Sequence, residues 1–179
     1  MNAPVTSKWK KITFSPGDTR ADIDSKLLDK LVDLNFLHHS VYVIRLTGIF
    51  AIQYINEVSP VIYIGEGHFR GRLSRHRIWL RKLGKLFAEM PLEVKFCHPT
   101  DPSGSPRNKE LEAHLLQLFK KKFGELPIQN KQQHKLRAGF SFATSNTGHI
   151  LGPGAGKKYK WAIRALIKDP LKANQRGEA

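Results

Sequence analysis

An arginine and a histidine four residues apart, Arg72 and His76, fall in a segment with helical spacing, so their side chains would lie on one face. Arginine offers a planar fork of donors to a phosphate group, and histidine exchanges a proton near neutral pH. Glu112 stands at the edge of the apolar stripe of a later predicted helix, where Lys109 or Arg107 can neutralise it or its carboxylate can bind Mg²⁺. These groups suit hydrolysis of a phosphodiester, which needs an activated water and stabilised charge on the phosphate oxygens.

Two tyrosines lie on predicted strands, Tyr42 in residues 41–46 and Tyr63 in residues 61–65. A tyrosine hydroxyl has an ordinary pKa of about 10 and loses its proton only beside cationic or metal-bound neighbours. Taken singly, each tyrosine is more typical of a core residue with a bonded hydroxyl, and Asn130 is more typical of a turn. Only their combination with the arginine, histidine and glutamate indicates a site.

Taken in order, these elements resemble the signature of the GIY-YIG nuclease family. The matching stretches are Ser40-Val41-Tyr42, Tyr63-Ile64-Gly65, the pair Arg72 and His76, then Glu112, and finally Asn130. The resemblance covers residues 40–131 and is closest in style to the restriction-enzyme-like members. It implies an endonuclease that cuts DNA with Mg²⁺ or Mn²⁺. It also implies that Tyr42 is the base or base relay, Tyr63 orients, Glu112 binds the metal ion and Asn130 is a structural hydrogen bonder, with Arg72 and His76 completing the catalytic set.

Several features depart from the family pattern. Ser40 replaces a glycine, and residues 47–59 form an insertion between the two tyrosines that we expect to lengthen the hairpin or add a strand. Glu66 follows the second motif, where a carboxylate would repel a phosphate unless it points away. These departures leave two alternatives open: a nucleic-acid-binding module on the same fold with a decayed active site, and a nuclease that cleaves RNA.

The charge of the chain favours a polyanionic partner, because 30 Lys and Arg residues against 15 Asp and Glu give a net charge of +15. We expect DNA, with RNA not excluded. Residues 69–85 hold seven basic side chains and no acidic one, and a phosphate backbone would relieve their repulsion. The basic tail, residues 131–179, either grips phosphates as well or packs on the core with its lysines solvated. The expected nucleic-acid-binding residues are Arg70, Arg75, Arg77, Lys157, Lys158 and Lys160.

The elements that must position these residues follow from apolar spacing. We predict helices over 21–37, 68–84, 107–123 and a short basic one over 159–168, and strands over 41–46, 61–65 and 92–98. This order predicts an α+β fold, in which a small antiparallel β-sheet is flanked by helices. Residues 1–39 would be an N-terminal helical extension, 40–131 the nuclease-like core and 132–179 a basic C-terminal extension.

Several classes of protein are excluded. The single cysteine, Cys97, allows neither an intrachain disulfide nor a multi-cysteine zinc site. The basic start of the chain lacks the apolar stretch of a signal peptide, and no window approaches 18 apolar residues. We therefore expect a soluble cytoplasmic protein that does not contact a membrane. A cut through both DNA strands needs two active sites or two visits, so a homodimer is allowed but not indicated.

Overall fold

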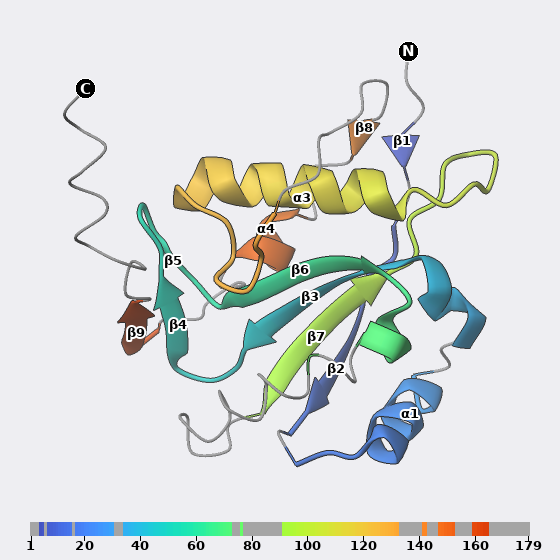
Figure 1. Ribbon diagram of the computed structural model, residues 1–179, viewed down its shortest axis with the longest axis horizontal. Helices are drawn as coiled ribbons and strands as arrows, with labels where there is room; N and C mark the ends of the chain where they lie inside the picture. Colours follow the sequence, from blue (N-terminus) through green and yellow to red (C-terminus); the bar gives the residue numbers. More distant parts are fainter. Residues whose placement is uncertain are drawn as a thin grey trace.

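A four-stranded antiparallel sheet forms the centre of the molecule (Figure 1). The computed structural model describes residues 4–5, 7–15, 17–30, 34–72, 76, 91–132, 141–142, 147–152 and 159–164. In sheet order the strands are β2 (Lys10–Phe14), β7 (Leu92–Cys97), β3 (Ser40–Leu46) and β6 (Val61–Gly67). Every residue of β3 is buried, so this strand is the centre of the core. The predicted strands at 41–46, 61–65 and 92–98 are confirmed, whereas β2 lies in a stretch where no strand is predicted from the sequence.

Different elements cover the two faces of this sheet. On one face Tyr42 of β3 packs against Phe69 of the helical residues 69–72, with ring centres 5.0 Å apart. On the other face Arg45 donates a hydrogen bond of 2.8 Å to the backbone carbonyl of His149 in α4 (Thr147–Leu151). Tyr42 and Arg45 are three residues apart on a strand, so their side chains point to opposite faces.

The helix α3 (Asn108–Phe123) lies along the β6 side of the sheet, and α1 (Arg20–Leu28) lies beside β2 at the other side (Figure 1). Leu111, Leu115 and Phe119 recur at helical spacing on α3 and are all buried. The helix ends at Gly124, whose φ of 86° is the left-handed conformation that favours glycine. The prediction of a helix over 107–123 is therefore confirmed.

The single helix predicted over 21–37 is wrong. A capping box between Thr19 and Asp22 begins α1, and the helix ends at Leu28, with Asp29 as its C-cap. The segment that leads into β3 is a 3₁₀-helix, η1 (Leu34–His39), and it buries Leu37 in the core. The apolar spacing that suggested one long helix therefore arises from two short helical elements that reach the core separately.

A second, smaller sheet has the order β5 (Val58–Ser59), β4 (Phe50–Gln53) and β9 (Trp161–Arg164). The insertion between the tyrosines supplies β4 and β5. It therefore adds strands, which was one of the two outcomes expected for it. The helix predicted over 159–168 is wrong at residues 161–164, which pair with β4 in parallel. Backbone groups at the edge of β4 satisfy those of β9, and such tertiary pairing overrides a local helical pattern.

The α+β fold class predicted from the sequence is confirmed. A further two-residue parallel pair joins β1 (Pro4–Val5) to β8 (Ser141–Phe142) near α3 (Figure 1). In the part of the chain that the structure describes, we find no helix with both the length and the hydropathy needed to cross a membrane.

Candidate active site

The two motif tyrosines lie side by side on neighbouring strands. Tyr42 is fully buried on β3, and its ring centre is 5.9 Å from that of Tyr63 on β6. Gly65 is the cross-strand partner of Tyr42. A Cβ atom at Gly65 would lie 2.5 Å from Cε1 of Tyr63 and 2.9 Å from the hydroxyl oxygen of Tyr42. The glycine of the second motif is therefore needed for the space that lets the two rings approach.

His76 completes an aromatic and polar group with these tyrosines. Its Nε2 atom is 3.1 Å from the hydroxyl oxygen of Tyr42, and its ring centre is 4.7 Å from that of Tyr63. Burial is the main cause that raises the pKa of Tyr42 above its ordinary value, and Tyr63 adds to this effect. Arg72 opposes the rise. Tyr42 is accordingly a protonated hydroxyl at neutral pH, held beside an imidazole nitrogen that can accept or return its proton.

Arg72 lies one helical turn before His76 and remains 43% exposed at its side chain. Its Nη2 atom is 3.6 Å from Oε1 of Glu66, and its guanidinium would lie 3.6 to 3.8 Å from a Cβ placed on Gly67. The guanidinium thus lies over the end of β6, with part of its fork open to solvent. A phosphate can reach it there without displacing the core.

Glu112 is a buried carboxylate in the first half of α3, only 5% exposed. The pKa of Glu112 is raised to about 7, mainly by burial and also by the charge of Glu66, while Arg72 opposes the rise. Arg107, one of the cations considered as a neutralising partner, instead pairs with Asp101 at 2.6 Å. Near neutral pH the carboxyl of Glu112 is therefore close to balance between its two protonation states, and a cation would favour the charged one.

Asn130 holds the outer edge of β6. Its side-chain oxygen accepts from the backbone N–H of Ile64 at 3.0 Å, and its side-chain nitrogen donates to the carbonyl of Ile64 at 2.7 Å. In the four-stranded sheet β6 is an edge strand, so the amide takes the place that a neighbouring strand would have. It fixes the backbone that lies between Tyr63 and Gly65.

Sequence reasoning missed the roles of Glu66 and Asn108. Glu66 does not simply point away from the site: Asn108, the first residue of α3, donates a hydrogen bond to its Oε2, and Arg72 lies beside its Oε1. The departure of Glu66 from the family pattern was the available signal. Ser40, another departure, is buried and its hydroxyl lies within hydrogen-bonding distance of the carbonyls of Leu37 and Gly67, so a serine fits this position.

Only two of the six predicted nucleic-acid-binding residues, Arg70 and Lys160, lie within the described ranges. Arg70 makes a two-point contact with Asp24, through Nε at 2.8 Å and through Nη2, so much of its charge is already offset within the protein. Lys160 is exposed just before β9. Arg75, Arg77, Lys157 and Lys158 lie outside the described residues.

All six predicted catalytic residues are described, and the structure places them around the end of β6 and its neighbours. Two carboxylates, Glu66 and Glu112, interact electrostatically there. Within the described ranges, no group of three or more His, Cys, Asp or Glu side chains is arranged to hold a metal ion. Mg²⁺ retains several waters and needs only one or two carboxylates from the protein, so this donor set fits it.

We compared the chain with models of protein families, with curated proteins and with solved structures, and none of them matches it.

Proposed function

We propose that the protein is a divalent-metal-dependent endonuclease that hydrolyses phosphodiester bonds in DNA, similar in its site to the GIY-YIG nucleases. The observation that carries the proposal is the meeting of side chains from separate parts of the chain. The hydroxyl of Tyr42 lies 3.1 Å from Nε2 of His76, while Arg72 and Glu112 act on the charge of that hydroxyl. A core of ordinary packing residues has no need of an arginine, a histidine and a buried carboxylate at one point.

The geometry suggests a role for each side chain. Tyr42 can take a proton from the attacking water while its own proton passes to Nε2 of His76, so it acts as a relay and needs no tyrosinate. Arg72 offers its exposed fork to the non-bridging oxygens of the scissile phosphate. Gly65 and Asn130 keep Tyr63 and Tyr42 in register.

Glu112, with Glu66 nearby, would hold Mg²⁺ or Mn²⁺ through carboxylate oxygens. Such an ion stabilises the negative charge that develops on the phosphate and on the leaving oxygen. The buried position of Glu112 suits this role, because a carboxylate with little solvent gains more from a nearby cation than an exposed one does.

Two alternatives to this function remain. The protein is a nucleic-acid-binding module whose active site has decayed, or it is a nuclease that cleaves RNA instead of DNA. The observation that favours the binding module is the contact between Arg72 and Glu66, because an arginine held by a carboxylate is less available to phosphate. The basic surface would bind nucleic acid in either case.

The test is the nicking of supercoiled plasmid with Mg²⁺, with Mn²⁺ and with EDTA, alongside a structured RNA of similar length. Glu112→Gln is expected to abolish cleavage and to leave DNA binding within about threefold, since a neutral amide is a far weaker ligand for Mg²⁺. Glu110→Gln on the same helix is the matched control and should cut normally. If the protein retards DNA in a gel but cuts neither nucleic acid, it is the binding module and not a nuclease. If it cuts only RNA, its substrate is RNA.

A further inference from the structure

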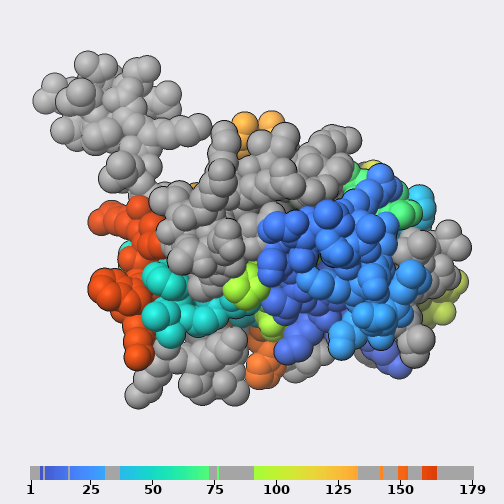
Figure 2. Space-filling model, turned by 90° about the horizontal axis from the view of Figure 1, so that it is seen from below, coloured from blue at the N-terminus to red at the C-terminus, as the bar shows by residue number. Residues whose placement is uncertain are grey.

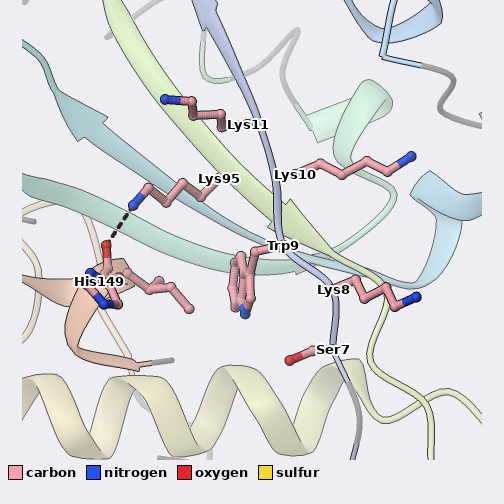
Figure 3. A pocket seen from close by; sticks show the side chains of 8 residues that line it. Ser7, Lys8, Trp9, Lys10, Lys11, Lys95 and His149 are labelled. Carbon is pink, nitrogen blue, oxygen red and sulfur yellow. Dashed lines mark hydrogen bonds between the residues drawn. The ribbon is translucent and has the colours of Figure 1, made fainter. Parts of the chain in front are cut away.

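A pocket of about 510 Å³ lies where the chain enters the edge strand β2. Figure 3 shows it between this segment, β7 and α4, with Trp9 at its centre. Its principal lining residues are Lys8, Trp9, Lys11, Lys95, His149 and Ile150. None of these residues belongs to the candidate active site.

The pocket is on the opposite face of the sheet from Tyr42. Lys95 is the cross-strand partner of Lys11, and its Nζ donates to the backbone carbonyl of His149 at 2.6 Å. Arg45, which points away from the Tyr42 face, donates to the same carbonyl. The residues of the pocket can therefore bind a ligand but cannot touch the atoms that react at the candidate active site.

Its charge is positive. The side chain of Lys11 is 72% exposed, with Oε2 of Glu93 at 4.0 Å, and Lys95 lies 3.9 Å from Oε1 of the same glutamate. One carboxylate thus faces two ammonium groups here, and Lys8 adds a third, exposed lysine. Figure 3 shows Lys8 and Lys10 directed to the other side of the strand from Lys95. Cationic side chains therefore lie on both sides of the edge strand. Such an arrangement fits a chain of phosphates better than a single anion.

The aromatic side chain at its centre distinguishes this pocket from a merely basic surface. Trp9 is partly buried and packs against the hydrophobic core, so its indole is fixed in position. It also lines the pocket, so part of the ring is accessible from it. A fixed aromatic ring beside lysines is the arrangement on which single-stranded nucleic acids stack a base. Bases inside a duplex are already stacked and cannot enter such a pocket without being extruded.

We propose that this pocket binds a single-stranded segment of nucleic acid, with one base stacked on Trp9 and the neighbouring phosphates held by Lys8 and Lys11. The inference rests on the proposed function for its class of partner, and it makes the substrate a nucleic acid with an unpaired region. In Figure 2 the N-terminal residues, in blue, form much of one face of the molecule beside β7.

The test measures binding of a ten-nucleotide oligothymidylate by tryptophan fluorescence, in EDTA so that no cleavage is needed. We expect quenching in the wild type that is largely lost in Trp9→Phe, and an affinity about tenfold lower in Trp9→Ala. Trp9→Phe preserves packing, and its unfolding temperature should match that of the wild type. Lys8→Gln with Lys11→Gln should reduce the slope of log affinity against log salt by about 1.4, since each single-strand phosphate contributes about 0.7. Lys120→Gln with Lys121→Gln, exposed lysines at the far end of α3, is the matched control.

Two further ligands make the result decisive. Heparin, a polyanion without bases, should not reproduce the quenching of Trp9, and a blunt duplex should bind without it. Equal quenching by heparin, or an unchanged affinity in Trp9→Ala, would overturn the proposal. If Trp9→Phe behaves as the wild type with the oligonucleotide while the plasmid is still nicked, the pocket proposal fails and the nuclease remains. If the plasmid is never cut but Trp9 is quenched as expected, the pocket stands without the enzyme.

Discussion

Gly65→Ala tests whether the close approach of the two tyrosines is needed for activity. The new Cβ would lie 2.5 Å from Cε1 of Tyr63, and ordinary contact begins near 3.4 Å, so that ring must move by about 1 Å. Tyr42 is fully buried against Phe69 and has no room to yield. Overpacking of this kind costs about 1–3 kcal/mol in the free energy of unfolding. A displacement of about 1 Å in a catalytic array costs about a hundredfold in rate.

Two measurements separate these effects. The free energy of unfolding comes from urea titration, where a loss of about 2 kcal/mol lowers the midpoint by about 1 M. The cleavage rate comes from plasmid nicking at saturating protein. Gly17→Ala is the matched control, because nothing lies within 4 Å of a Cβ placed there, and it should change neither quantity. If Gly65→Ala cuts within threefold of the wild type and unfolds at the same urea concentration, the argument from ring spacing is wrong.

Three further outcomes are expected. Arg72→Lys should lower the nicking rate at least tenfold although the charge is kept, since an ammonium group cannot reproduce the two-point fork; near-normal nicking would make Arg72 a surface cation. Asn130→Asp should lower the free energy of unfolding by about 1–3 kcal/mol at pH 7, because a carboxylate cannot donate to the carbonyl of Ile64; an unchanged urea midpoint would contradict this. Because the pKa of Glu112 is raised to about 7, the folded state holds its proton more tightly than the unfolded state. In EDTA the free energy of unfolding of the wild type should therefore fall relative to that of Glu112→Gln as the pH rises from about 4.5 to 7. Parallel curves of stability against pH for the two proteins would contradict this.

The sequence predicted best what depends on local apolar spacing. The strands β3, β6 and β7 and the helix α3 were predicted within one or two residues, because each has a buried apolar pattern of its own. The candidate site was proposed from motif order, since its tyrosines and glutamate belong to those elements and its arginine and histidine follow β6 in the chain.

What the sequence did not predict depends on pairing between distant segments. β9 forms only because β4 offers it an edge more than 100 residues earlier in the chain, and no local signal marks that partner. The contact of Glu66 with Asn108 joins β6 to the start of α3, and a list of residues does not reveal it. The position of Trp9 in the pocket likewise depends on where β2 joins the sheet.

The parallel pairing of β9 with β4 also bears on the order in which the chain folds. Closing so long a loop costs entropy before any contact is gained, and all four residues of β9 remain exposed, so little burial compensates. The antiparallel pair of β3 and β6 is much closer in sequence and is buried in the core. We therefore expect β9 to join last during folding and to detach first under mild denaturant, with its amide hydrogens exchanging long before those of β3.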